Sequence, residues 1–349
     1  EAGATFQYGQ DVYREGKRPI GRAYFGSSWG ALGFLLAGSY SDKDGWDRDG
    51  VLPDDGDKQK AGNIGGRVSF DLSDHHGLIA GFEYSGIEDE GHRFFQNMDR
   101  NRTSEERRQN YFLEYKGRFT PLSDFMLRVN RSEHENDIQM SPYAQLTAEE
   151  DARRSLDQVE GRFTAAWGDK HLFTIGSEFR SEKMEEATGL DEKTDNLGFY
   201  FQDEYQLFEP LYFVFGLRHD RHSDFGSEWT PRTAMVYEFL DNLRFKASYG
   251  TGFRAPTMSE LFVTSYRQRG KYVYEPNPDL EPEDSKSYEV SVEGEYNSIY
   301  GIITAFRIEL ENLIEPVFQG AAGQGKTKTD YYRYENIAEA TMEGLELEY

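Results

Sequence analysis

Alternation of apolar and polar residues with a period of two is the feature that most constrains the fold of this chain. The clearest runs place apolar side chains at every second position over 243–249, 288–296 and 302–310, with charged residues such as Arg244 and Glu289 between them. Successive side chains of a strand point to opposite faces, so this pattern indicates strands with one apolar and one polar face. Helical spacing is nearly absent, and the sequence therefore predicts an all-β protein.

The connections between the expected strands alternate strictly between short and long. We place short turns at 29–32, 73–77, 120–124, 168–170, 208–210, 240–242 and 297–298. We place long polar loops near 9–18, 42–59, 88–105, 136–151, 183–194, 221–228, 253–284 and 312–333. Outer-membrane barrels have short periplasmic turns and longer extracellular loops. We therefore expect an antiparallel transmembrane β-barrel with about sixteen strands present. A soluble all-β protein is the alternative.

Composition excludes several classes of protein. The 349 residues carry a net charge of -24, from 63 acidic and 39 basic residues, which is the opposite of a nucleic-acid-binding footprint. There is no Cys, so a disulfide framework and Cys-based chemistry are excluded. No run of about 18 apolar residues is present, which excludes a transmembrane helix. We find no catalytic constellation, so an enzyme is not expected.

Aromatic residues make up 15% of the chain, and many lie near the ends of expected strands, as Tyr84, Tyr111, Tyr200 and Phe208 do. Aromatic girdles at the membrane interface explain such placement. The general preference of aromatic residues for strands explains it equally well.

Two short boxes, joined by one long loop, distinguish this chain from a generic barrel. The first is Phe253-Arg254-Ala255-Pro256, and the second is Asn277-Pro278-Asp279-Leu280. A third stretch, 336–348, begins at Asn336. Together they resemble the FRAP box, the NPNL box (NPDL in this chain) and a later strand of the TonB-dependent outer-membrane receptors, in the branch of haem, cobalamin and catecholate-siderophore transporters.

The resemblance implies a receptor in the outer membrane of a Gram-negative bacterium that imports an iron complex, either a ferric siderophore or haem, with energy transmitted by TonB. Cobalamin uptake by the same family and a passive porin are the alternatives, and an outer-membrane lipase or protease barrel would need a rim site that we do not find. Large transporters of this kind have 22 strands and a plugged lumen. We therefore interpret residues 1–349 as a barrel domain truncated at the C-terminal side. The plug and TonB-binding box would precede Glu1.

The loop between the boxes is the candidate ligand-binding segment. Its prolines, among them Pro256 and Pro278, fix φ and stop the strands from extending into the loop. The boxes either hold a ligand-proximal loop over the barrel mouth or only shape the strand exits. Basic and aromatic residues that suit an anionic chelate or haem are Tyr266, Arg267, Arg269, Lys271, Tyr272 and Tyr274. A solvated loop would have the same composition.

Histidines and aspartates offer further candidates. The haem receptors that the chain resembles carry an axial His between the boxes, and this chain has none there. His92, His134 and His222 lie at or near expected outer loops, where they could face a ligand. Closely spaced carboxylates with intervening glycines suit Ca²⁺, and the candidate ligands are Asp42, Asp44, Asp47 and Asp49. The cobalamin receptors carry calcium at a similar place, although a solvated acidic loop is the plainer interpretation.

Overall fold

A computed structural model describes the chain except for residues 11–16, 46–56, 96–97, 141–150, 188, 241, 268–270, 298 and 326–327. The described residues form eighteen strands and one short helix, α1 (Met258–Phe262). The strands are β1 (Ala2–Gln10), β2 (Lys17–Trp29), β3 (Leu32–Lys43), β4 (Lys58–Ser73), β5 (His76–Phe95), β6 (Met98–Thr120), β7 (Ser123–Met140), β8 (Asp151–Trp167), β9 (His171–Glu186), β10 (Asp191–Phe208), β11 (Leu211–His222), β12 (Gly226–Leu240), β13 (Leu243–Arg254), β14 (Ser265–Arg267), β15 (Tyr272–Glu275), β16 (Glu283–Tyr296), β17 (Ile299–Ala322) and β18 (Thr329–Glu348). No helix within these described ranges is long and apolar enough to cross a membrane.

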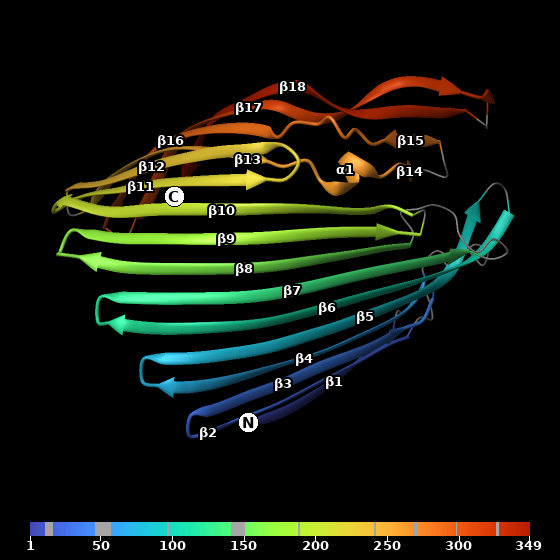
Figure 1. Ribbon diagram of the computed structural model, residues 1–349, viewed down its shortest axis with the longest axis horizontal. Helices are drawn as coiled ribbons and strands as arrows, with labels where there is room; N and C mark the ends of the chain where they lie inside the picture. The colour runs from blue at the N-terminus through green and yellow to red at the C-terminus, as the bar shows by residue number, and fades with distance from the viewer. Residues whose placement is uncertain are drawn as a thin grey trace.

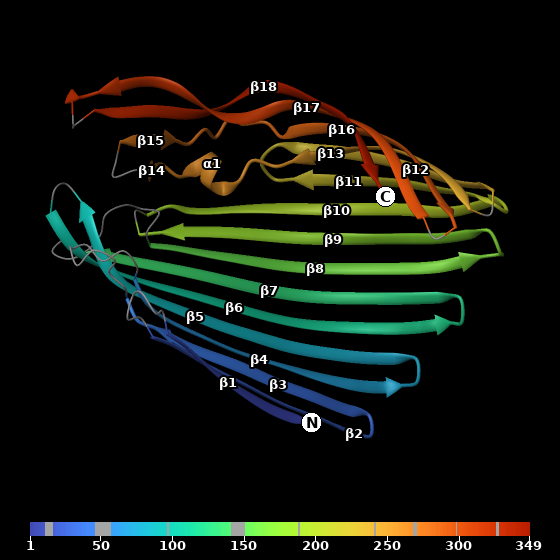
Figure 2. The same ribbon diagram turned by 180° about the vertical axis from the view of Figure 1, so that it is seen from behind.

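Neighbours in the chain are neighbours in the sheet. Each strand from β1 to β13 pairs antiparallel with the next, β13 pairs with β16, and β16, β17 and β18 follow in order. Strands β14 and β15, of three and four residues, lie in the connection between β13 and β16. Figure 1 shows one curved sheet with β1 and β18 at opposite edges, and Figure 2 shows it from behind. The expected antiparallel sheet of about sixteen wall strands is confirmed.

The strand ends that flank the seven expected short turns lie where the sequence places them, at one end of the sheet (Figure 1). Gly30 and Gly168 sit in two of these turns with φ values of 57° and 62°, a backbone conformation that glycine adopts without steric cost. The prediction for the other end was wrong in part. Segments 88–105 and 312–333 are mostly paired strand, because β5, β6, β17 and β18 continue far beyond the ~9–11 residues that cross a bilayer. Residues 88–93 and 99–105 are almost all polar or charged, so the apolar alternation that signals a strand is lost there.

The outer face carries a continuous apolar belt. In register across β6 to β10 lie Leu113, Val129, Val159, Phe179 and Leu197. The first four of these side chains are 41–50% exposed in a chain whose other face is polar. Such a belt is the lipid-facing surface of a transmembrane barrel. Aromatic residues border it, with Trp29 and Trp167 at the short turns and Tyr111 toward the other end.

Not every strand-end aromatic belongs to a girdle. Tyr200 faces the inside of the sheet, where its hydroxyl donates to Glu160 Oε1 at 3.1 Å and its ring covers Gly176. Strand β17 departs from the simple expectation in a similar way. Its apolar positions 302–310 pair with the polar face of β16, and Phe306 lies opposite Glu289. The ring of Phe306 packs over Gly344 of β18, where a Cβ would lie 3.0 Å from it, so the inner face of β17 is the apolar one.

Buried residues concentrate around the loop between β13 and β16. Of the seven buried apolar residues in the described part of the chain, Leu261, Val263, Val273 and Leu280 belong to this loop. A fifth, Ile314 of β17, packs with Leu261 and Leu280. The wall strands are one layer thick and have no such core, so the loop is the most densely packed part of the molecule.

Candidate functional site

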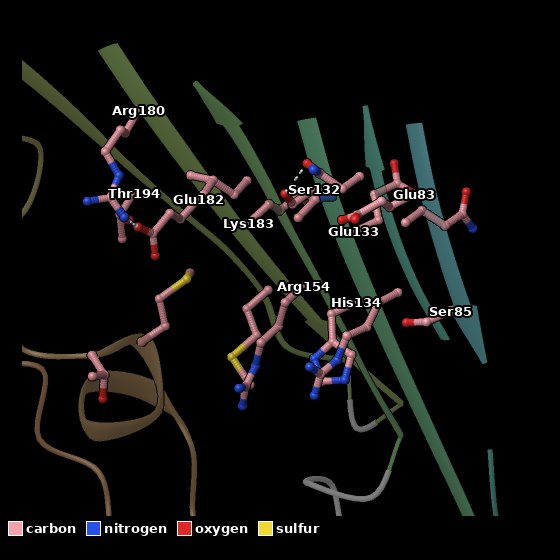
Figure 3. Close-up of a pocket in the computed structure, with 18 of the residues that line it drawn as sticks. Glu83, Ser85, Ser132, Glu133, His134, Arg154, Arg180, Glu182, Lys183 and Thr194 are labelled. Carbon is pink, nitrogen blue, oxygen red and sulfur yellow. Dashed lines mark hydrogen bonds and ion pairs between the residues drawn. The ribbon is translucent and has the colours of Figure 1, made fainter. Parts of the chain in front are cut away.

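A cavity of about 1080 Å³ lies on the inner face of the sheet, at the end away from the short turns. We call it the inner pocket. Its floor is formed by strands β4 to β11, and α1 with the residues before it forms one side, from Ala255 to Ser259. Figure 3 shows the lining side chains projecting from the wall strands toward the helix. The pocket is the main concavity that this part of the wall offers to a ligand.

A row that contains three basic side chains, which we call the basic row, crosses the floor of the inner pocket. Arg108 of β6, His134 of β7, Arg154 of β8 and Met184 of β9 are cross-strand partners in strict register. Adjacent strands lie ~4.8 Å apart, so Arg108 and Arg154 stand roughly 10 Å from each other along the row. All four line the pocket, and His134 and Arg154 lie side by side in Figure 3.

Of the two arginines in this row, Arg154 has fewer acidic partners. Arg108 forms an ion pair with Glu106, and His134 Nε2 lies 3.0 Å from Glu106 Oε1. Arg154 instead donates to the hydroxyl of Ser259 in α1 at 3.2 Å, and it has no carboxylate partner among the described residues. A guanidinium bonded only to a neutral hydroxyl keeps donors available for an anion.

His222 of β11 also lines the pocket but lies outside this row, because its cross-strand partner is Asn196 of β10. It stacks on Phe225 with ring centroids 3.9 Å apart, and its Nδ1 accepts a hydrogen bond from the amide of Asp224. Burial lowers the pKa of His222, so this imidazole is neutral at pH 7. His134 and His222 both line the pocket, and their contact with a ligand stays a prediction; the side chain of His92 lies outside the described residues.

Helix α1 begins with a capping box that the sequence Thr257-Met258-Ser259-Glu260 encodes. The Thr257 hydroxyl accepts from the Glu260 amide, and the Glu260 carboxylate accepts from the Thr257 amide at 2.7 Å. This reciprocal pairing satisfies two backbone donors of a helix only five residues long. It directs Met258 and Ser259 to the pocket and Leu261 to the packed cluster behind it.

Arg254 of the first box ties this helix to the wall. Its guanidinium donates to both carboxylate oxygens of Glu283, at 2.7 and 2.5 Å, and to Glu260 at 3.1 Å. Glu283 also accepts from the amide of Ile314 at 2.8 Å. The Arg254 hydrogen bond lowers the pKa of Glu283, and the same contact raises the pKa of Arg254. We call Arg254, Glu260 and Glu283 the root clamp, because they join β13, α1 and β16.

The second box is anchored to β18. The Asn277 side-chain amide donates to the carbonyl of Tyr334 at 2.8 Å, while its oxygen accepts from Arg333 at 3.0 Å. Asn336 holds the chain after the box, since its side chain accepts from the Glu281 amide and donates to the carbonyls of Glu281 and Asn312. These contacts give Asn277 of the second box and Asn336 of the later strand a structural role, because each satisfies backbone groups of a neighbouring segment.

The remaining box residues have plainer roles. Phe253 is the last residue but one of β13 and makes an edge contact with Phe225. Pro256 and Leu280 are buried, Ala255 lines the pocket, and Pro278 and Asp279 form an exposed turn in which the Asp279 amide donates to Asn277. Both boxes are therefore fixed to neighbouring strands at the base of the loop, and the idea that they hold a ligand-proximal loop stays a prediction.

The expected ligand-binding loop is more structural than its composition suggests. Tyr272 and Tyr274 lie in β15, which pairs parallel with β18, and their rings pack on Tyr332 with centroids 6.2 and 5.3 Å away. Tyr266 is 48% exposed, and Lys271 is exposed while its carbonyl accepts from the Asp330 amide. Arg267 belongs to β14, but its side chain, like all of Arg269, lies outside the described residues.

The calcium prediction remains untested. Asp47 and Asp49 lie outside the described residues. Asp42 is at the end of β3 opposite Lys60, and Asp44 accepts from the Lys17 amide at 3.3 Å. Among described residues, no group of three or more His, Asp or Glu is arranged to hold a metal ion.

Sequence reasoning missed Arg108, Arg154 and Met184. Arg108 and Arg154 lie just beyond the expected loops 88–105 and 136–151, Met184 lies within the expected loop 183–194, and nothing in their immediate sequence marks them. The alternation of side chains along each strand contained the signal. Arg108 and Arg154 lie five residues before the outward-facing apolar residues Leu113 and Val159, and this odd spacing places both arginines on the opposite, inner face. Only the register between strands shows that they form one row.

Comparisons with known proteins agree with this architecture. Residues 3–349 match the family described as TonB dependent receptor-like, beta-barrel. The vitamin B12 transporter BtuB of Photobacterium profundum is 26% identical over 233 residues, which cover 64% of this chain and 34% of that protein. The chain thus spans about a third of the length of this curated relative.

Solved structures show the same fold. The siderophore receptor PirA from Pseudomonas aeruginosa superposes with a TM-score of 0.80 at 18% identity, over 99% of this chain and 62% of that one. The hemophore receptor HasR from Serratia marcescens, in complex with its hemophore HasA and heme, gives 0.74 at 15% identity, over 99% of this chain and 60% of that one. The family match extends along nearly the whole chain, and this protein belongs to the TonB-dependent receptor β-barrel family.

Proposed function

We propose that this chain forms the wall and outer loops of a receptor in the outer membrane of a Gram-negative bacterium that imports an anionic iron chelate, either a ferric siderophore or haem. The observation that carries the proposal is the basic row, with Arg108, His134 and Arg154, on the floor of the inner pocket. Four arginine and lysine side chains and three carboxylates line the pocket, so its lining reverses the acidic balance of a chain of net charge -24; the seven residues are Arg108, Arg154, Arg180, Lys183, Glu83, Glu133 and Glu182. Such a reversal attracts and orients an anion.

The proposed mechanism is capture followed by energised release. Arg154 donates hydrogen bonds to an anionic group of the chelate, because its guanidinium has no carboxylate among the described residues to neutralise it. Met258 of α1, which is half-buried in the lining of the pocket, supplies apolar surface beside the bound molecule. No bond of the ligand breaks in this step. Release inward depends on a plug and on TonB, which we propose as partners through the family to which the chain belongs.

Cobalamin is the second candidate ligand, and one observation favours it: the sequence match to a vitamin B12 transporter. The charge of the pocket distinguishes the two candidates. A site built for an iron chelate depends on Arg154, whereas a site built for cobalamin depends less on a single cation. The exposed Tyr266 and Lys271 remain proposed contacts for either ligand, at the outer surface of the loop.

Uptake in cells tests the function directly. The protein is produced in full length in a Gram-negative host that lacks its own receptors for ferric enterobactin, haemin and cyanocobalamin, with and without TonB. We expect TonB-dependent accumulation of labelled iron from enterobactin or haemin. Accumulation that is equal in the two hosts would indicate a passive porin, and accumulation of cyanocobalamin alone would overturn the iron-chelate assignment in favour of the second candidate.

A further inference from the structure

The loop between the two boxes does not have the structure of a flap. Eight of its residues are buried, namely Pro256, Leu261, Val263, Ser265, Val273, Asn277, Leu280 and Pro282. A movable extracellular lid would be expected to have few buried contacts and exposed backbone hydrogen bonds. This loop has the opposite character, although its ends are joined to wall strands that bury very little.

The contacts of the loop are distributed unevenly between the two sides of the pocket. Toward β16–β18 it has the root clamp, the Leu261–Leu280–Ile314 cluster, the asparagine contacts and the parallel pairing of β15 with β18. Toward β8, among the described residues, it has the single hydrogen bond from Arg154 to Ser259 at 3.2 Å. The contacts that hold the loop are therefore mainly those with β16–β18, and its contact with β8 is slight.

We infer that α1 is a preformed side of the inner pocket, and that Arg254 is the positioning residue that sets it. Arg254 is not among the residues that line the pocket, and it acts through Glu260, whose carboxylate also accepts from the Thr257 amide that begins the helix. The position of Ser259, and with it the geometry around Arg154, then depends on an ion pair formed with Glu283 in β16. The ligand finds this side of the pocket already built.

The inference rests on the proposed function only where ligand affinity is concerned. The clamp itself is tested without ligand, by hydrogen–deuterium exchange of the intact receptor in detergent. The informative amides are those of Leu261, Val263 and Asn277, which donate to the carbonyls of Thr257, Ser259 and Glu260. We expect slow exchange in the parent protein and at least tenfold faster exchange in Arg254→Ala. Arg254→Lys, which keeps the charge but loses the fork, should give an intermediate rate.

Two further variants make the result decisive. Arg307→Ala is the matched control, because Arg307 bonds to Glu309 on the outer face, and it should leave these amides unchanged. Glu260→Gln keeps an acceptor for the Thr257 amide and removes only the charge, so it reports on the ion pair even if Arg254→Ala assembles poorly. Equal exchange rates in Arg254→Ala, Glu260→Gln and Arg307→Ala would overturn the inference.

Affinity for ferric enterobactin links the clamp to the pocket. We expect Arg254→Ala to bind this probe at least tenfold more weakly, Arg254→Lys to recover part of the loss, and Arg307→Ala to bind as the parent does. Faster exchange without any loss of affinity would overturn the positioning role of Arg254. If Arg154→Ala also binds as the parent does, the proposed pocket is wrong, while the exchange result still decides whether the clamp exists.

Discussion

At the scale of single residues, Arg254 and Arg154 both contact α1, but they have different roles because their bonding partners differ. Arg254 is neutralised by two carboxylates and fixes the backbone around it. Arg154 has a hydroxyl as its partner and keeps its charge available. A bidentate contact with one carboxylate and a further contact with a second hold Arg254 in place, whereas the single bond of Arg154 to a neutral hydroxyl can be exchanged more readily.

The clamp predicts a pH dependence with a definite sign. The hydrogen bond from Arg254 lowers the pKa of Glu283, so the folded pKa lies below the unfolded value of about 4.3. The stabilisation from this group is fully present above the unfolded pKa and is lost as the pH falls through the folded pKa. A fluorophore on Met258→Cys should keep constant anisotropy from pH 8 to pH 5 and lose it only below about pH 4.

The same titration has a clear control and a contrary result. Glu283→Gln removes the titrating group, so the label should then show no acid transition of its own. A loss of anisotropy between pH 6 and pH 8 would assign the effect to a histidine instead, and would contradict the account of the clamp.

At the scale of elements, Asn336 determines how the second box meets β18. Its side chain satisfies one amide and two carbonyls of neighbouring segments at 2.8–2.9 Å. Asn336→Asp replaces the two donated hydrogen bonds by contact between a carboxylate and two carbonyl oxygens. We expect exchange of the Glu281 amide to accelerate at least tenfold, or roughly 1.4 kcal/mol. Thr341→Ala, an exposed site on the same strand, should change nothing.

Strand β17 yields a test of register. Its inner face is expected to carry Thr304 and its outer face Ile303, since these pair with Ser291 and Val292 of β16. The chain has no Cys, so a single introduced thiol is the only site of labelling. Thr304→Cys should react with a water-soluble maleimide, and Ile303→Cys only with a membrane-soluble one. The reverse pattern would show that β17 is shifted by one residue, which turns every side chain to the other face.

The elements also show what the sequence could and could not predict. Turns such as Gly30–Ala31 were predictable because the alternating pattern of one strand ends there and that of the next strand begins directly afterwards. The extended hairpin of β5 and β6 was not, because strands such as 98–108 lack an apolar face once they leave the membrane. The row of Arg108 and Arg154 could not be predicted for a related reason. The two residues are 46 positions apart in the chain and come together only through pairing between strands, and no local motif marks them.

At the scale of the whole molecule, the wall is a single layer of strands, and the loop between the boxes is its well-packed part. The strands present an apolar belt outward and polar groups inward, as a barrel in a bilayer requires. The buried apolar residues gather instead at the loop between the boxes, where α1 meets the inner pocket. The family motifs therefore shape the loop that carries α1 on one side of the inner pocket, and the proposed ligand-binding residues Arg108 and Arg154 belong to the wall strands.

The most direct test of this account is the affinity of the full-length receptor for ferric enterobactin, measured by fluorescence quenching in detergent, in the double variant Arg108→Ala/Arg154→Ala. Loss of two charge-assisted hydrogen bonds, at about 1.5 kcal/mol each, predicts an affinity reduced on the order of 100-fold. The matched control is Arg107→Ala/Arg153→Ala, which removes the neighbouring arginines on the outer face, and it should bind as the parent does. Equal affinities in the two double variants would contradict the inner pocket as the ligand site.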